Sequence, residues 1–109
     1  MQRTEPEGIV ISCDFCGCDW DEVKPMIEGH RGSVLCLECL KLALPATEAG
    51  QDGFACTMCI RDLPSYVPRW AHPRPGPGAN PTAVLCEDCI SQAAGTFSKD
   101  PDVDWKRPR

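Results

Sequence analysis

Eight of the nine cysteines in this chain stand in four Cys-x-x-Cys pairs. Thiolates are soft ligands, and two such pairs separated by roughly twenty residues are typical of one tetrahedral zinc site. The gaps fit that pattern, because residues 17–35 separate the first two pairs and residues 60–85 separate the last two. The sequence therefore predicts two structural zinc ions (Zn²⁺), each held by four cysteines: Cys13, Cys16, Cys36 and Cys39 in the first site, and Cys56, Cys59, Cys86 and Cys89 in the second.

Disulfide bonds are the other common use of many cysteines in a short chain. Three features favour metal: the cysteine count is odd, the spacing is regular, and residues 1–7 contain no apolar stretch of the kind found in a secretory signal. The sequence also lacks the run of ~18 apolar residues that a membrane span requires. We therefore expect a soluble, cytoplasmic zinc protein that does not contact a membrane.

Zinc also explains how so short a chain can fold. Two halves of about 55 residues are marginal as unaided hydrophobic cores. The 109 residues include only three Trp, three Phe and one Tyr. A structural zinc site contributes roughly 10–16 kcal/mol, whereas the whole stability of a typical domain is about 5–15 kcal/mol. We expect the metal to supply most of the folding free energy.

The charge of the chain disfavours nucleic acid as a partner. The formal net charge is −5, and residues 1–52 carry ten acidic side chains against four basic ones. Such a surface repels a phosphate backbone unless basic residues gather locally. The one basic cluster is Lys106-Arg107-Pro108-Arg109, which we expect to be solvated.

The two halves of the sequence form a duplicated unit. Cys13-Asp-Phe-Cys16 corresponds to Cys56-Thr-Met-Cys59 at an offset of 43 residues. Val34-Leu-Cys-Leu-Glu-Cys39 corresponds to Val84-Leu-Cys-Glu-Asp-Cys89 at an offset of 50. Seven extra residues therefore lie inside the second unit, where they coincide with the Pro/Gly-rich stretch 72–81. We expect that stretch to form a loop.

The sequence of each unit predicts a tight turn, a hairpin and a helix, in that order. The turn brings the first two cysteines together, and Gly17 suits it because glycine tolerates positive φ. An apolar run then pairs with the residues before the third cysteine: 23–27 with 33–35, and 66–70 with 83–85.

The last two cysteines of each unit open a helix, which we expect to end before Pro45 in the first unit and at Gly95 in the second. A competing short helix over Asp19-Trp-Asp-Glu22 has the pattern of a capping box. The predicted fold class is a small metal-stabilised α+β protein with two tandem treble-clef-like zinc fingers. The expected organisation is an N-terminal tail (1–10), a first finger (11–47), a linker (48–53), a second finger (54–96) and a flexible tail (97–109).

The first unit resembles a known family. Its segments Cys13-Asp-Phe-Cys-Gly17, Asp21-Glu-Val-Lys24, Met26-Ile-Glu-Gly29 and Ser33-Val-Leu-Cys-Leu-Glu-Cys39 are similar to the N-terminal C4-type zinc-binding domain of ClpX, the unfoldase of the ClpXP protease. The resemblance covers roughly residues 11–44. The second unit looks like a diverged copy, which keeps the ligands but lacks the glycine after its first pair.

The resemblance implies zinc ligands at the eight paired cysteines and a role in protein interaction. In ClpX this domain dimerises and engages substrates and adaptors, and it performs no chemistry. The present sequence contains no Gly-x-x-x-x-Gly-Lys-Ser/Thr phosphate loop. We therefore expect a non-enzymatic adaptor or regulator with protein partners, including a second copy of itself. A nucleic-acid-binding zinc finger and a thiol redox switch with releasable zinc are the alternatives.

Three further residues offer metal-binding side chains outside the pairs. Cys18 is expected to be an incidental free cysteine, because Asp19 and Asp21 disfavour its thiolate. His30 and His72 are expected to lie on the surface, because four sulfurs already complete each structural site.

The aromatic residues are expected to fill the small core rather than to form an exposed recognition face. This expectation covers Phe54, Trp20, Tyr66 and Trp70. Trp105 lies in the charged, Pro-containing C-terminal segment, which we expect to be disordered alone and able to dock on a partner.

Overall fold

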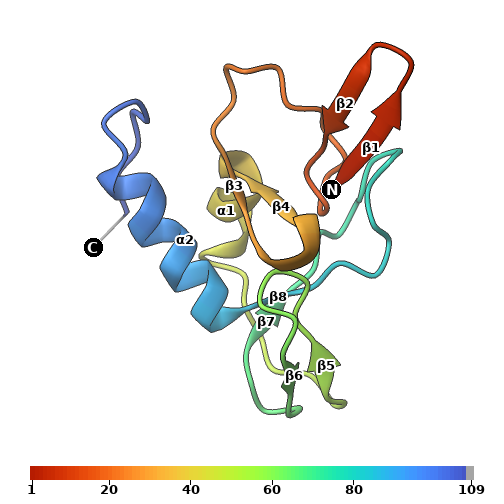
Figure 1. Ribbon diagram of the computed structural model, residues 1–109. Coiled ribbons are helices and arrows are strands. Elements are labelled where there is room, and N and C mark those ends of the chain that lie inside the picture. Colours follow the sequence, from red (N-terminus) through yellow and green to blue (C-terminus); the bar gives the residue numbers. More distant parts are fainter. Residues whose placement is uncertain (108–109) are drawn as a thin grey trace.

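The computed structural model describes residues 1–107 and consists of short hairpins and two helices (Figure 1). Its eight strands pair as four two-stranded antiparallel sheets: β1 (Gln2–Glu5) with β2 (Gly8–Ile11), β3 (Met26–Glu28) with β4 (Val34–Cys36), β5 (Phe54–Ala55) with β6 (Asp62–Leu63), and β7 (Arg69–Trp70) with β8 (Leu85–Cys86). The helices are α1 (Leu37–Ala43) and α2 (Glu87–Lys99), and a 3-10 turn, η1, spans His30–Gly32. The α+β fold class is confirmed, whereas the treble-clef assignment stays a prediction.

The hairpins of the two units have the same register. Met26 lies opposite Cys36 in the first hairpin, and Arg69 lies opposite Cys86 in the second. These positions differ by the predicted offsets of 43 on one strand and 50 on the other. The seven extra residues therefore fall between β7 and β8, as the sequence predicted.

The turns are tied to the hairpins by matching hydrogen bonds. In the first unit the Val34 N–H donates to the Asp14 carboxylate at 2.9 Å, and in the second the Val84 N–H donates to the Thr57 hydroxyl, also at 2.9 Å. The first amide of each helix donates to the carbonyl of a proline 3.0 Å away, at Pro25 and Pro68. Both prolines thus lie just before their strands, where a missing N–H costs nothing.

The second helix is longer than predicted. It does not stop at Gly95 but continues to Lys99. Phe97 is only 2% exposed, and burying such a side chain contributes about 1.5–3 kcal/mol, which outweighs the cost of about 1 kcal/mol for a glycine inside a helix. Packing against the rest of the molecule, rather than local propensity, sets this boundary.

The C-terminal segment beyond α2 lies on the helix. Val103 is buried, and Trp105 packs partly against the core. The Arg107 N–H donates to the Ser98 hydroxyl at 2.8 Å, which holds the segment along α2. Residues 108 and 109 of the predicted flexible tail lie outside the described residues.

The N-terminal segment also differs from the prediction of a plain tail. Residues 2–11 form the β1–β2 hairpin, which projects from the rest of the molecule in Figure 1. The competing helix over residues 19–22 is absent. Instead the Asp21 carboxylate accepts the N–H groups of Val23 and Lys24 at 2.9 and 2.8 Å, an arrangement that forms a turn.

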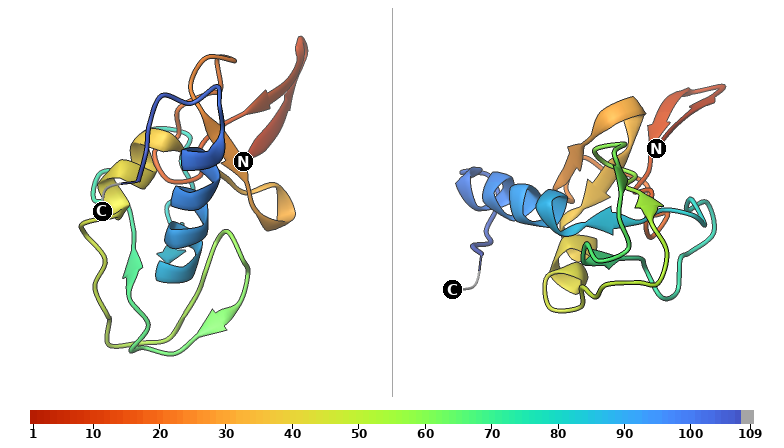
Figure 2. Two further views of the ribbon diagram at one scale, coloured as in Figure 1. Left: turned by 90° about the vertical axis from the view of Figure 1, so that its left-hand side faces the viewer. Right: turned by 90° about the horizontal axis from the view of Figure 1, so that it is seen from below.

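The two units share one hydrophobic core. Helices α1 and α2 pack against each other, as the views in Figure 2 show, and the rings of Phe15 and Trp70 lie 5.8 Å apart. The radius of gyration is 13.7 Å, close to the value of about 13 Å expected for a single domain of 100 residues. The units therefore form one body rather than two independent fingers.

The core prediction holds for some aromatic residues and is wrong for others. Trp70 is buried and Phe54 packs against the core. Trp20 is 44% exposed and Tyr66 is 76% exposed. In the described part of the chain, neither helix is long and apolar enough to cross a membrane.

Candidate metal centres

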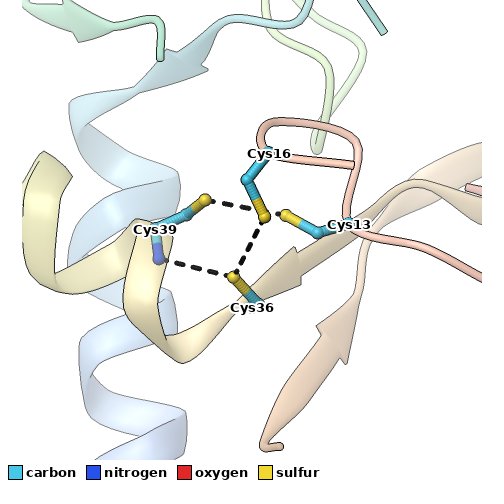
Figure 3. A group of neighbouring side chains, drawn as sticks. All are labelled: Cys13, Cys16, Cys36 and Cys39. Carbon is cyan, nitrogen blue, oxygen red and sulfur yellow. Dashed lines mark hydrogen bonds between the residues drawn. The ribbon is translucent and has the colours of Figure 1, made fainter. Parts of the chain in front are cut away.

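The first centre collects four sulfurs from a turn and from the start of a helix. Cys13 and Cys16 lie on the turn, Cys36 ends β4, and Cys39 lies in the first turn of α1 (Figure 3). All four Sγ atoms lie within 4.8 Å of one another. The Cys36 sulfur also accepts the Cys39 N–H at 3.4 Å and so caps the helix.

The second centre is built the same way. Cys56 and Cys59 lie on the turn after β5, while Cys86 and Cys89 lie at the β8–α2 junction. Their sulfurs again lie within 4.8 Å of one another. The Cys86 N–H donates to the Cys56 sulfur at 3.4 Å.

The spacing of the sulfurs fits a tetrahedral zinc ion. Zn–S bonds of ≈2.3 Å place two sulfurs of a tetrahedron about 3.8 Å apart. In the first centre the Cys13–Cys39 and Cys16–Cys36 sulfur pairs are each separated by 3.7 Å. In the second centre the sulfur pairs Cys56–Cys89 and Cys59–Cys86 are 3.7 and 3.9 Å apart. These distances are far longer than a disulfide bond, and all nine cysteines are free.

Each turn is closed by a residue in the left-handed region. The Gly17 N–H donates to the Cys13 carbonyl at 2.9 Å, and the Ile60 N–H donates to the Cys56 carbonyl at 2.8 Å. Their φ angles are 82° and 55°. Glycine adopts this conformation freely, but for a β-branched residue it costs roughly 1–2 kcal/mol. The second turn is therefore strained at Ile60.

The thiols of each centre titrate as a group. Hydrogen bonds from Cys36 and Cys39 hold the pKa of Cys13 well below its usual range, and a hydrogen bond from Cys89 lowers the pKa of Cys56 to about 4. The pKa values of Cys39 and Cys89 lie above the usual range, chiefly because each thiol bonds to the thiolate already present. A divalent cation removes this competition by neutralising several thiolates at once.

The two centres differ at one neighbouring position. Cys18 places its sulfur 3.2 Å from the Cys16 sulfur. At the matching position of the second unit, the Nε of Arg61 donates to the Cys59 sulfur at 3.3 Å. Burial and the neighbouring Cys16 raise the pKa of Cys18 to about 11. The bond to Cys59 raises the pKa of Arg61.

The contact made by Arg61 was missed by the sequence analysis. The offset of 43 residues, which relates Cys59 to Cys16, also relates Arg61 to Cys18. This repeat offset was the sequence signal that could have identified the position of Arg61. It would have placed a cation and a thiol at equivalent positions beside the two sulfur clusters.

The first centre is covered by the loop of the second unit. The Gly76 N–H donates to the Cys16 carbonyl at 3.1 Å, and the Asn80 N–H donates to the Asp14 carbonyl at 2.8 Å. A Cβ added at Gly17 would lie 2.6 Å from the Pro77 carbonyl oxygen, so the loop approaches the turn too closely for any side chain there. The insertion in the second unit therefore serves as a cover for the first.

The two histidines do not enter the sulfur clusters. His30 lies in η1, where its backbone N–H donates to the Met58 carbonyl of the other unit at 2.8 Å. His72 lies against Trp70, with ring centroids 5.6 Å apart, and its Nδ1 accepts the Arg74 N–H. Within the described residues, the groups of side chains placed to bind a metal consist of the eight paired cysteines.

Comparison with known proteins supports the resemblance of the first unit. Residues 11–45 match the ClpX C4-type zinc finger family. The match covers 35 of the 109 residues, and the second cluster of four cysteines fits a second, diverged copy of this ClpX-type finger. No curated protein and no solved structure matches the chain. The predicted family resemblance is thereby confirmed, and the sulfur geometry is consistent with two zinc ions.

Proposed function

We propose that this chain is a zinc-binding protein-interaction module, in which the eight paired cysteines hold two structural zinc ions. The observation that carries the proposal is the pair of closed four-sulfur clusters, one of them inside a segment that matches the ClpX-type finger. Four sulfurs fill the coordination sphere and leave no position for a reacting water. The zinc therefore organises the fold, and the module has no catalytic activity of its own.

The surface of the ClpX-type finger supports a protein partner. Val23 is 83% exposed, and Trp20 lies on the same loop. Trp20 also lines a shallow groove of about 190 Å³, together with side chains of β2, β3 and β4 that are apolar except for Glu28. Exposed apolar side chains next to such a groove are typical of protein interaction sites. We name this region the loop-20 surface: Ile11, Trp20, Val23, Met26 and Ile27.

The partner chemistry follows from charge and from the resemblance. A net charge of −5 opposes nucleic acid, and four thiolates with one zinc ion add about two further negative charges to each site. Together with the resemblance to a domain that engages other proteins, this favours a cytoplasmic adaptor or regulator related to the ClpX zinc-binding domain. Self-association is one form of this interaction, and the loop-20 surface is the face expected to mediate it.

The experiment is affinity purification from the native host with quantitative mass spectrometry. The wild type is compared with a Trp20→Ser/Val23→Ser variant. Tyr66→Ser serves as the control, because Tyr66 is also a large exposed side chain, at 76%, but lies on the second unit. We expect one protein to be lost only with the double variant. Equal recovery with all three baits contradicts the loop-20 surface.

Sedimentation at several protein concentrations tests self-association with the same variants. Binding to DNA or RNA that weakens steeply with salt would instead favour the nucleic-acid alternative. The acidic surface predicts no such binding at physiological salt.

A further inference from the structure

The first centre contains a fifth sulfur that the zinc site does not need. The Cys18 sulfur lies 3.2 Å from the Cys16 sulfur, closer than the 3.7 Å that separates Cys16 from its fellow ligand Cys36. Both Cys16 and Cys18 are partly exposed. When zinc is bound, Cys16 is a thiolate that can only accept a hydrogen bond, and the Cys18 thiol becomes the donor.

In the second unit an arginine occupies the position equivalent to Cys18. Arg61 donates its Nε–H to the Cys59 sulfur, and it also lies 3.6 Å from the Asp88 carboxylate. Zinc already keeps this sulfur as a thiolate, so a hydrogen bond from a guanidinium only lowers its basicity, and the nucleophilicity of a thiolate falls with its basicity. The guanidinium also has no oxidisable atom that could bond to the sulfur. In both units the residue two positions after the second cysteine contacts the sulfur of that cysteine. Only in the first unit is this residue a thiol, which can form a covalent bond to the sulfur.

We propose that Cys16 and Cys18 form an oxidation site, at which peroxide creates a disulfide that opens the first zinc centre while the second stays intact. The inference rests on the zinc binding proposed above. It assigns Cys18 a role as the resolving thiol of a ligand cysteine. It also assigns the two units different roles, since one responds to oxidant and the other holds the fold.

The chemistry balances with hydrogen peroxide as the oxidant. The Cys16 thiolate attacks one peroxide oxygen, the O–O bond breaks, and a sulfenic acid and hydroxide form. The Cys18 sulfur then attacks the Cys16 sulfur, the S–O bond breaks, and the leaving hydroxide takes the Cys18 proton to become water. One thiolate, one thiol and one peroxide give one disulfide, one water and one hydroxide. The two sulfurs lose two electrons and peroxide gains them.

The geometry requires only a short movement. The sulfurs must approach from 3.2 Å to a bond length of about 2.05 Å. Gly17, which stands between the two cysteines, has a φ of 82° and makes the tight turn available. Once bonded to Cys18, the Cys16 sulfur is no longer an anionic ligand. Three sulfurs then remain in the first centre, and metal affinity falls.

The test exposes the zinc-loaded, reduced protein to a small excess of hydrogen peroxide. Released zinc is measured with a metallochromic indicator, and the tryptic peptide 4–31, which carries Cys13, Cys16 and Cys18, is measured by mass spectrometry. We expect release of one of the two ions, loss of two hydrogens from this peptide through a Cys16–Cys18 bond, and recovery with thiol reductant and zinc. The second centre keeps its metal.

Three variants separate the effect of the thiol from the effect of the charge. Cys18→Ser keeps a hydroxyl donor but cannot bond to Cys16, so we expect zinc release to slow by about tenfold or more, because an adjacent thiol acts at high effective concentration. Arg61→Cys places a thiol beside Cys59, and we expect it to make the second centre release zinc as well. Arg61→Ala removes the cation without adding a thiol and should not give a disulfide.

Equal release rates for the wild type and Cys18→Ser would overturn the inference, as would a disulfide between two ligand cysteines. Retention of both ions after peroxide would overturn it while leaving the proposed zinc binding intact. An untreated protein without zinc would overturn both proposals.

Discussion

The first and second units hold their sulfurs in the same geometry but surround them differently. The turn of the first unit contains Gly17 and Cys18, whereas that of the second contains Ile60 and Arg61 at the matching positions. One turn is relaxed and carries a spare thiol, while the other is strained and carries a cation. Ligand spacing therefore determines the fold of a unit, and the residues beside the ligands determine its strain and its reactivity.

The two units also depend on each other unequally. The loop 72–81 of the second unit donates two backbone hydrogen bonds to the turn of the first. In the opposite direction, the second turn receives one backbone hydrogen bond from the described part of the first unit, from the backbone N–H of His30 to the Met58 carbonyl. The first centre should therefore suffer more from loss of the second than the second suffers from loss of the first.

The largest expected effect comes from removing one ligand per site. Cys39→Ser and Cys89→Ser should each lower the zinc content from about two ions to about one, because a structural site contributes roughly 10–16 kcal/mol only when its ligand set is complete. Cys89→Ser should also weaken zinc binding by the first centre more than Cys39→Ser weakens the second. Elemental analysis and competition with a chelator measure both effects. Equal losses of affinity would contradict the unequal dependence.

The next largest effect concerns the joint core. Phe15→Ala and Trp70→Ala each remove one ring of the pair that joins the units, and each should cost about 3–5 kcal/mol. Unfolding in denaturant, followed by fluorescence and circular dichroism, should show one transition for both units. The exposed Tyr66→Ala is the control, with an expected change within about 0.5 kcal/mol. Two separate transitions in the wild type would disprove the shared core.

A smaller effect distinguishes the two turns. Gly17→Ala should destabilise the protein by more than about 1 kcal/mol, because φ is positive and the new methyl group would meet the Pro77 carbonyl. Ile60→Gly relieves roughly 1–2 kcal/mol of strain but adds about 0.5–1 kcal/mol of backbone entropy, so its net change should be small. Thermal unfolding of the zinc-loaded proteins tests the contrast. Destabilisation by Ile60→Gly as large as by Gly17→Ala would refute it.

The smallest effect concerns the N-terminal hairpin, which has no counterpart in the second unit. Hydrogen bonds from Arg3 and Ser12 lower the pKa of Asp19. The stabilising contribution of its carboxylate is therefore complete above the ordinary value of about 3.9 and is lost as the pH falls through the lower folded value. Nuclear magnetic resonance should find this lowered pKa. Asp19→Asn should speed amide exchange in β1 and β2 near neutral pH. Unchanged exchange would show that Asp19 does not stabilise the hairpin.

Much of the arrangement could be predicted from the sequence because it follows from the ligand spacing. The cysteine pairs specified the turns and the helix starts, and the offsets of 43 and 50 placed the hairpins and the extra loop. The extension of α2 past Gly95 could not be predicted, since it depends on burial of Phe97 against another element. The exposure of Trp20 was unpredictable for a related reason: composition does not tell which aromatic side chains find room in a small core.

The contacts between the units were also beyond the sequence. The loop 72–81 was predicted as an irregular segment, but its position over the first turn is a tertiary contact. In the sequence Arg61 is an ordinary basic residue. Its role beside the second centre is visible only from the 3.3 Å hydrogen bond between its Nε and the Cys59 sulfur. The repeat offsets identify equivalent positions in the two units, whereas the contacts that the side chains make there are visible only in the three-dimensional structure.

The central claim is that two metal ions supply the folding free energy of both units. The most direct measurement strips zinc from the reduced protein with a chelator, records the amide spectrum by nuclear magnetic resonance, and then adds zinc back in steps. We predict collapse of the dispersed spectrum without metal and full recovery at two equivalents per chain. A metal-free, reduced chain that keeps its dispersed spectrum would contradict the claim.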